Sequence, residues 1–312
     1  MKRRLVVFVC LLTVLWNLVA CNQNSHSLND RFYFRFADDL EREVTLYEKP
    51  CRVAVLFSSY AEIWRLAGGE VAVTVGESVT RGFAPQNVIL VDAGAGKSIN
   101  REVLLASRPD FIIASADIEA QVACAELFEQ ADIPIAFFQV DSFDDYLHML
   151  DICTRITENS MAYSQYGTKV QQQIHDTLSA VPKDANPKIL FIRVGSKVAK
   201  AKVAGDHFAC DMLADLNTKN IADNAPILID GLSLEEILRE DPDCIFISTM
   251  GDEDAAVANM ESIFSEPAWQ SLSAVREGRC HYLPKDLFQY KPNHRWAEAY
   301  EYLKELLYCN EE

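Results

Sequence analysis

Short apolar runs alternate with helical patterns along the first half of the chain. The apolar runs are continuous rather than alternating, which is typical of parallel strands buried on both faces. Expected strands cover Arg52–Phe57, Val71–Val75, Phe111–Ala114 and Ile133–Phe138. Expected helices cover Ala61–Leu66, Glu102–Ser107 and Ile118–Gln130. Strands and helices in this order predict an α/β unit with a parallel sheet.

A different pattern begins near residue 143. Between Phe143 and Ala180 there is no proline, the single glycine is Gly167, and apolar residues recur at helical spacing. We expect one helix of roughly 35 residues, about 50 Å long, which could span two lobes. The α/β pattern then resumes, with expected strands at Ile189–Arg193, Cys244–Ile247 and Cys280–Leu283 and expected helices at Leu234–Arg239 and Trp296–Leu307. The predicted fold class is α/β, with two parallel-sheet lobes joined by one long linker helix.

The N-terminus carries a targeting pattern. Lys2, Arg3 and Arg4 precede an apolar run, Leu5 to Trp16, that is too short to cross a bilayer. The residues Leu18-Val19-Ala20-Cys21 resemble a bacterial lipobox, in which the cysteine is lipidated and becomes the first residue. The alternative is an ordinary secretory signal followed by an unmodified cysteine. We therefore divide the chain into a signal peptide (1–20), a lipidated tether and N-terminal extension (21–43), an N-terminal lobe (44–142), a linker helix (143–182) and a C-terminal lobe (183–312).

Composition narrows the possible partners. The net charge is −17, and it becomes −20 without residues 1–20, which contain three bases and no acid. Such a chain is repelled by phosphate backbones, so we expect no nucleic-acid partner. None of the nine cysteines forms a C-x-x-C pair, which argues against zinc-ribbon and thioredoxin motifs. Seven cysteines remain after Cys10 and Cys21, and an odd number leaves at least one thiol unpaired within the chain.

Candidate ligand-binding residues follow the expected strands. In open α/β sheets, ligands bind outside the carboxyl ends of the strands, and two such lobes would place a pocket between them. The candidates in the two lobes are Ser59, Tyr60, Arg81, Phe83 and Ser115, followed by Arg193, Thr249, Met250, Phe288, Tyr290 and Lys291. Trp64 and Trp296, at helical spacing, are expected in the core.

Charge and aromatic content suggest what the pocket could hold. Residues 188–205 contain five bases and no acid, so they could attract an anionic chelate, with Arg193 the best candidate. The alternative is that Lys197, Lys200 and Lys202 are solvated charges at a strand edge. The aromatic candidates could stack on a flat ligand. His207 lies in no strong metal motif, and we interpret it as a solvated or capping residue.

Short motifs recur in a fixed order along the chain. The first three are Lys49-Pro50-Cys51-Arg52-Val53-Ala54-Val55, then Ser58-Ser59-Tyr60-Ala61-Glu62, then Gly96-Lys97-Ser98-Ile99-Asn100-Arg101-Glu102 followed by Arg108-Pro109-Asp110. The second lobe repeats the last pattern in Ser233-Leu234-Glu235-Glu236-Ile237 and Asp241-Pro242-Asp243. In this order the motifs resemble the substrate-binding proteins of ABC importers for iron complexes, haem and vitamin B12, and the resemblance covers about Val44 to Tyr308.

The resemblance implies a lipoprotein that captures a ferric siderophore or haem in an inter-lobe cleft. It implies two Rossmann-like lobes, an extracytoplasmic location with lipid anchoring through Cys21, and an ABC permease with its ATPase as partners. The protein would be a monomer, would not be an enzyme, and would need neither a cofactor nor a resident metal. Glu102 and Glu235 match the family's surface glutamates that dock on the permease, although both are also ordinary first-turn helix acids.

Three other functions remain open. Cobalamin is carried by the same family, and molybdate or tungstate could bind to backbone N–H groups near Ser59 and Ser115. An extracytoplasmic hydrolase could use Ser58 or Ser59, since these serines follow a strand and precede a helix. However, the sequence lacks the G-x-S-x-G pattern of the nucleophile elbow.

Overall fold

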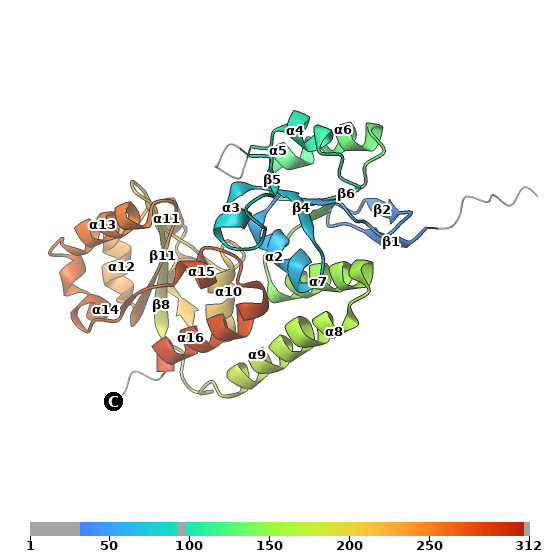
Figure 1. The fold of residues 1–312 in the computed structure, drawn as a ribbon. Helices are drawn as coiled ribbons and strands as arrows, with labels where there is room; N and C mark the ends of the chain where they lie inside the picture. Colours follow the sequence, from blue (N-terminus) through green and yellow to red (C-terminus); the bar gives the residue numbers. More distant parts are fainter. Residues whose placement is uncertain (1–31, 93–97, 309–312) are drawn as a thin grey trace, which may run out of the picture.

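The computed structural model describes residues 32–92 and 98–308. The predicted signal peptide, Cys21 and Cys309 lie outside the described residues. In the part that is described, no helix is both long and apolar enough to cross a membrane. Two sheets organise the structure, and each is built from the apolar runs of one half of the chain (Figure 1).

The N-terminal lobe is built around a five-stranded parallel sheet of order β5-β4-β3-β6-β7. Its strands are β3 (Val53–Val55), β4 (Val71–Thr74), β5 (Ile89–Leu90), β6 (Phe111–Ser115) and β7 (Ile135–Phe138). Its helices are α2 (Ser58–Leu66), α3 (Gly76–Thr80), α4 (Arg101–Ala106), α5 (Glu119–Val122) and α6 (Ala125–Gln130). All four strands expected here are confirmed. The helix expected at Ile118–Gln130 is two short helices, α5 and α6.

The C-terminal lobe contains a second sheet of order β10-β8-β11-β12, to which β9 adds an antiparallel edge on β8. Its strands are β8 (Lys188–Val194), β9 (Ala199–Ala201), β10 (Lys219–Asn220), β11 (Cys244–Thr249) and β12 (Cys280–Tyr282). Its helices are α10 (Phe208–Asp215), α11 (Pro226–Asp230), α12 (Leu234–Glu240), α13 (Glu253–Phe264), α14 (Ser273–Arg276), α15 (Lys285–Phe288) and α16 (Trp296–Tyr308). The predicted α/β class with two parallel sheets is confirmed.

A hairpin that the sequence did not predict covers one edge of the first sheet. Strands β1 (Phe34–Ala37) and β2 (Glu43–Leu46) pair antiparallel, although β1 falls in the segment predicted to be an extension. The turn of the hairpin bonds the exposed edge of β7. The N–H of Phe137 donates to Asp38 Oδ2 at 3.1 Å, and the N–H of Asp39 donates to Phe137 O at 2.9 Å. The hairpin thus protects an edge strand that could otherwise pair with another chain.

The connection between the lobes is two helical segments, so the prediction of one unbroken helix is wrong. Helix α7 (Phe143–Thr157) ends at Glu158, which adopts a left-handed conformation with φ 62°. Asn159 then caps α8 (Ser160–Tyr163) by accepting from the N–H of Ala162 at 3.3 Å. The break involves neither proline nor glycine. It is held by a tertiary contact, since the Asn159 amide donates to Ala67 O at 3.2 Å.

The second segment forms the actual crossing. A π-helical turn (Ser164–Thr168) joins α8 to α9 (Lys169–Ser179), and backbone angles stay helical through both junctions. Helix α7 packs against α2 in the N-terminal lobe, whereas α9 packs against α16 in the C-terminal lobe. In Figure 1, α8 and α9 accordingly run alongside α7 and continue to the other lobe. Gly167 permits this packing, because an added Cβ would lie 3.1 Å from Leu147 Cδ2.

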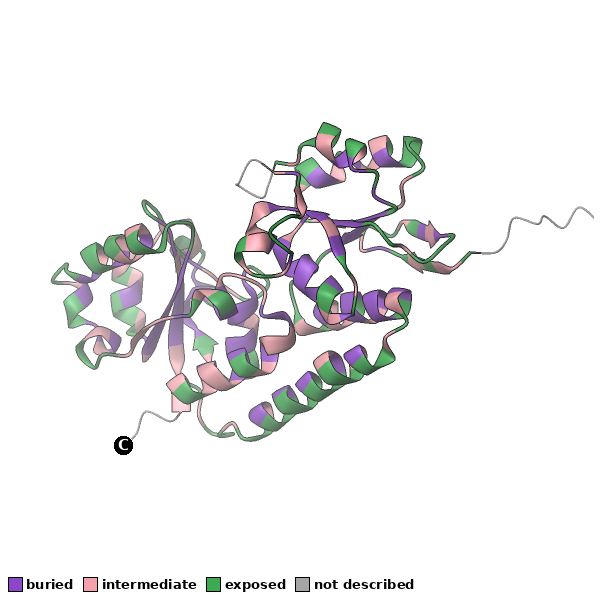
Figure 2. Cartoon of the chain, in the orientation of Figure 1, coloured by how far each residue is buried: buried purple, intermediate pink, exposed green. Residues whose placement is uncertain are grey.

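The lobes share one hydrophobic core. Buried side chains from both sheets, such as Phe138 and Phe191, belong to a single cluster that also contains Trp296 of α16. Two further clusters fill the outer halves of the lobes. Figure 2 shows the buried strands at the centre of each sheet. Trp64 and Trp296 are 2% and 1% exposed, which confirms that both are core residues.

Candidate ligand cleft between the lobes

A cleft of about 900 Å³ lies where the carboxyl ends of the two sheets face each other. The N-terminal lobe contributes the segments that follow β3, β4, β6 and β7. The C-terminal lobe contributes the end of β8, the start of α10 and the segments that follow β11 and α15. This placement follows the general rule for open α/β sheets, which position ligands beyond the carboxyl ends of their strands.

Hydroxyl groups on the N-terminal wall are organised by Arg81. The Arg81 guanidinium donates to Ser58 Oγ at 2.9 Å and to Ser59 Oγ at 3.2 Å. It also stacks on Phe83 and Tyr290, with its Cζ 4.7 Å and 4.0 Å from the ring centroids. Burial lowers the pKa of Arg81, and the nearby carboxylates oppose that shift. Arg81 therefore fixes the positions of the two serine hydroxyls and of the Tyr290 ring.

Arg193 is the principal charged group on the C-terminal wall. It is the half-buried penultimate residue of β8, in register with Ser248 on β11 and Lys200 on β9. Its Nε atom is buried and has no hydrogen-bond partner, and no acid among residues 32–92 and 98–308 forms an ion pair with it. Burial lowers the pKa of Arg193, because the charged form has lost water. The cleft thus contains a partly desolvated cation that has no ion-pair partner among the described residues.

His207 lies beside Arg193 and is held neutral. Its Nδ1 accepts from the N–H of Ala209 at 3.2 Å and so caps α10, which confirms the capping interpretation. Since Nδ1 is an acceptor, the network assigns the ring proton to Nε2. Burial, followed by the charges of Arg193 and Lys291, lowers the pKa of His207 to about 3. His207 can therefore offer an N–H to a ligand.

An ion pair crosses the mouth of the cleft. Lys291 Nζ of the C-terminal lobe lies 2.7 Å from Asp141 Oδ1 of the N-terminal lobe. Burial alone would raise the pKa of Asp141, but hydrogen bonds from Lys291 and Gln139 outweigh it and lower that pKa. Burial, followed by the Asp141 charge, raises the pKa of Asp117 on the neighbouring loop.

The structure brings most of the predicted ligand residues to the cleft. Seven of them line it, namely Ser59, Tyr60, Ser115, Arg193, Met250, Tyr290 and Lys291. Arg81 and Phe83 do not line the cleft, but the Arg81 guanidinium lies against the rings of both Phe83 and Tyr290. Thr249 and Phe288 are 3% and 0% exposed and belong to the interior. Tyr60 is 1% exposed, and its hydroxyl donates to Phe138 O at 2.8 Å. The binding roles of all these residues stay predictions.

The charge of the cleft differs from the basic patch that the sequence suggested. Lys197, Lys200 and Lys202 do not line it, and Lys202 lies 3.7 Å from Asp206 in an ion pair. The lining also contains carboxylates, none of which belongs to the predicted ligand set, namely Glu77, Asp117, Asp141, Asp206 and Asp211. Asp141 could have been found, because it closely follows an expected strand.

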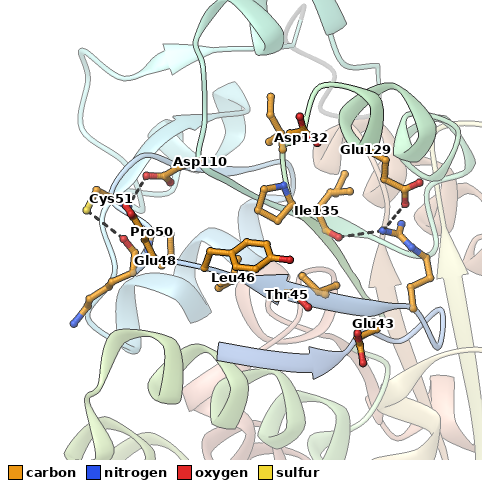
Figure 3. Close-up of a pocket in the computed structure, with 16 residues that line it drawn as sticks. Glu43, Thr45, Leu46, Glu48, Pro50, Cys51, Asp110, Glu129, Asp132 and Ile135 are labelled. Atoms are coloured by element: carbon orange, nitrogen blue, oxygen red, sulfur yellow. Dashed lines mark hydrogen bonds and ion pairs between the residues drawn. The ribbon is translucent and has the colours of Figure 1, made fainter. Parts of the chain in front are cut away.

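A second hollow, of about 850 Å³, lies at the amino ends of the strands of the first sheet, away from the cleft (Figure 3). It is bordered by β2 and by residues that precede the strands of the sheet, including Cys51, Asp110 and Pro134. Its main basic side chain is already paired, since Arg42 Nη2 lies 3.0 Å from Glu129 Oε1. The amino ends of parallel strands are not where this architecture binds ligands. We therefore assign the site to the cleft between the lobes.

Three further sequence predictions concern the surface and the thiols. Glu102 and Glu235 are both exposed in the first turns of α4 and α12, and their docking role stays a prediction. All six cysteines among the described residues are free thiols. In the same residues, no cluster of three or more metal-ligating side chains occurs.

Comparisons with known proteins agree with this geometry. A family model described as periplasmic binding protein matches residues 53–287. No curated protein matches the chain. Among solved structures, the iron uptake ABC transporter substrate-binding protein PiuA from Streptococcus pneumoniae is 17% identical, with a TM-score of 0.69 over 89% of this chain and 98% of that one.

Two further solved structures have the same fold. The periplasmic heme-binding protein RhuT from Roseiflexus sp. RS-1 is 17% identical, with a TM-score of 0.66 over 83% of this chain and 98% of that one. The periplasmic vitamin B12 binding protein BtuF of Vibrio cholerae is 21% identical, with a TM-score of 0.66 over 83% and 97%. At these identities the likeness establishes the fold.

Proposed function

Since this chain belongs to the periplasmic binding protein family, we propose that it is the substrate-binding subunit of an ABC importer for an iron complex. The ligand is a ferric siderophore or haem, held in the cleft between the lobes. Solved proteins of the same fold include one for iron uptake, one that binds haem and one that binds vitamin B12.

Arg193 carries the proposal for an anionic ligand. Arg193 lines the cleft, and no acid among the described residues forms an ion pair with it, so an anionic ligand would supply the missing partner of its guanidinium. A planar guanidinium matches a carboxylate or a chelating pair of oxygens in a bidentate arrangement. His207 Nε2–H lies on the same wall and adds a second donor. Both groups suit the oxygen-rich edge of a ferric siderophore or the propionates of haem.

The size of the cleft favours a chelate over a bare oxyanion. Small-molecule pockets usually measure about 300–1,000 Å³, and this cleft lies near the upper end at about 900 Å³. Phe57 and Tyr290 offer ring surface from the two sides. Molybdate would leave most of this volume to water. Cobalamin, in contrast, remains an alternative cargo that the titration below distinguishes.

The iron would arrive with its own ligands. His207 uses Nδ1 as a helix cap, and the Tyr60 hydroxyl is committed to Phe138 O. Burial also raises the pKa of Tyr60, which opposes the phenolate form that would ligate ferric iron. The protein therefore grips a chelate rather than extracting the metal.

The serines of the cleft are poorly suited to hydrolysis. Ser58 Oγ donates to Glu77 Oε2 and accepts from Arg81, so its proton already points to a carboxylate and its lone pair to a cation. Ser59 Oγ likewise accepts from Arg81. Glu77 could accept the Ser58 proton, but the hydrogen bonds from Arg81 draw electron density from both hydroxyl oxygens and make them weaker nucleophiles. Among the described residues, no histidine forms a hydrogen bond with either serine to act as the base of a hydrolase triad. We therefore assign these serines to the binding wall.

Delivery completes the proposed function. Lipidation of Cys21 would anchor the protein on the extracytoplasmic face of the cell membrane. Glu102 and Glu235, one on each lobe, would orient the loaded protein on basic residues of the permease, whose ATPase drives import. The protein acts as a monomer in this scheme.

A titration tests the ligand class. Ferric catecholate and hydroxamate chelates, haem, cobalamin and molybdate are added separately to the purified protein, with tryptophan fluorescence as the readout. Trp296 should report on occupancy, because its ring lies 5.4 Å from that of Phe208 on the cleft wall. We expect saturable binding of a ferric chelate or haem and its loss in Arg193→Gln. Binding of cobalamin or molybdate alone would reject the iron-complex assignment.

A further inference from the structure

The loop between α15 and α16 belongs to the C-terminal lobe by sequence but is attached to the N-terminal lobe. Its first half, Gln289 to Lys291, lines the ligand cleft. Its second half turns inward at Asn293, which is 0% exposed and lies against α2. Tyr290 and Lys291, which line the cleft, are therefore followed closely in the sequence by Asn293, which is buried against the N-terminal lobe.

Asn293 makes the central contact. Its amide Nδ2 donates to Ser59 O at 2.9 Å and to Glu62 Oε2 at 2.8 Å, across 234 and 231 positions of sequence. The backbone of Asn293 is left-handed, with φ 52°, a conformation that asparagine tolerates better than most residues. Both the side chain and the backbone of this residue are thus specific to the seam between the lobes.

The acceptor of this contact is a buried carboxylate. Glu62 is 7% exposed, and its other neighbours are Arg81 Nη2 at 3.9 Å and His294 Nδ1 at 3.0 Å. His294 comes from the same loop as Asn293. A buried carboxylate that lost its hydrogen bonds would carry a large desolvation penalty, so separation of the loop from α2 is opposed.

Two contacts fasten the ligand-facing half of the loop to the same lobe. Lys291 Nζ pairs with Asp141 Oδ1 at 2.7 Å, and the Tyr290 ring lies under the Arg81 guanidinium at 4.0 Å. Arg81 and Asp141 both belong to the N-terminal lobe. Tyr290 and Lys291 are therefore positioned by that lobe, although the chain reaches them from the other sheet.

We propose that Asn293 and Glu62 form an inter-lobe clasp, with Asn293 as a positioning residue that holds Tyr290 and Lys291 against the N-terminal wall of the cleft. The clasp fixes the angle between the lobes before ligand arrives, so the cleft is preorganised and affinity is not reduced by closure. The effect on ligand affinity rests on the proposed function, whereas the effect on the lobe angle does not.

The test compares two asparagines with the same backbone conformation. Asn293→Gly removes the amide and keeps the left-handed backbone unstrained. Asn217→Gly is the matched control, because Asn217 has φ 61° but bonds within the C-terminal lobe, to Ala185 O. Spin labels are placed at Glu126→Cys and Ala258→Cys, exposed positions on α6 and α13. The background carries Cys51→Ser, Cys280→Ser and Cys309→Ser, so that the label does not attach to these thiols. Pulsed electron resonance then measures the distance between the lobes without any ligand.

We expect Asn293→Gly to shift or broaden the inter-lobe distance by several ångström and to weaken binding of the titrated chelate about tenfold, as the loss of one or two hydrogen bonds implies. Asn217→Gly should change neither quantity. Asp141→Asn, at an exposed position that is safe for folding, should broaden the distance less. If the inter-lobe distance is unchanged in both Asn293→Gly and Asp141→Asn, the clasp is overturned, whether or not ligand affinity changes. If the parent binds no chelate while the distance shifts, the proposed function fails and the clasp stands.

Discussion

Replacement of Arg193 by methionine should stabilise the protein while it weakens ligand binding. The side chain is half-buried at the end of β8, its Nε has no partner, and no described acid neutralises it. Methionine has a similar length, needs no hydrogen bond and would pack beside Met250 and the other cleft residues. An apolar residue of similar shape in place of a poorly satisfied buried charge is often neutral or stabilising.

The magnitude follows from the unsatisfied donor. Removal of one such group should raise the free energy of unfolding by about 1–3 kcal/mol. For a chain of this size that corresponds to an increase in Tm of roughly 2–6 °C. The same substitution removes the charge-assisted bonds that a ligand would form. We therefore expect affinity for the chelate to fall about 10- to 100-fold.

The control is Arg42→Met. Arg42 is partly buried like Arg193 and also has one buried nitrogen without a partner, Nη1. Unlike Arg193 it has an ion pair, because its Nη2 lies 3.0 Å from Glu129 Oε1, and the same atom donates to Ile135 O at 3.3 Å. This substitution should lower Tm and leave ligand affinity unchanged. Both variants are measured by calorimetry without ligand and by fluorescence titration with it. If Arg193→Met lowers Tm as much as Arg42→Met does, then Arg193 stabilises the fold. Our interpretation of Arg193 as an unsatisfied cation that serves ligand binding is then refuted.

Three other substitutions test separate parts of the structure. Glu102→Lys together with Glu235→Lys should stop uptake into cells and leave ligand affinity intact, and uptake at the parental rate would contradict the docking role. Gly69→Ala should destabilise the protein by about 1–3 kcal/mol in a denaturant titration, because its Cβ would lie 2.1 Å from Trp64 Cε2; an unchanged midpoint would show that the indole can move. Burial holds the pKa of His207 at about 3 in the folded protein, below its ordinary value of 6.5. Between these two pH values the unfolded chain binds a proton that the folded protein does not. The free energy of unfolding therefore decreases as the pH falls through this range, by up to about 1.4 kcal/mol per pH unit. His207→Asn keeps a cap acceptor and should flatten this acid slope in unfolding curves measured from pH 7 to 4, whereas an identical slope would assign the effect to other groups.

The sequence by itself determined where the central strands lie along the chain, their parallel character and the general place of the candidate cleft. Runs such as Phe111–Ala114 and Ile189–Ile192 are short, continuous and apolar, a pattern typical of strands that are covered on both faces. Once the strands are assigned, the binding edge follows from geometry, which is why Ser59, Ser115 and Arg193 were found at the cleft. Local patterns are sufficient for these features because each depends on neighbours within one element.

Tertiary structure decided what each side chain contacts. Phe288 and Thr249, like Tyr290, were predicted to line the cleft, yet both are buried. Whether a side chain points into the cleft or into the interior depends on how the neighbouring elements pack. The helix break at Glu158 is marked by no proline or glycine, and the contact of the following asparagine with Ala67 that stabilises it depends on the packed fold. The hairpin at residues 34–46 is too short to be recognised without the sheet edge that it covers.

The contact between Asn293 and Glu62 illustrates the same limit most clearly. Neither residue is unusual in its own segment, and 231 positions separate them. An asparagine before a helix predicts a cap, and a glutamate within a helix predicts a solvated charge. Only the packing of two lobes makes one the hydrogen-bond donor of the other. Patterns along the chain specify elements, whereas the partners of buried polar groups are specified by the assembled fold.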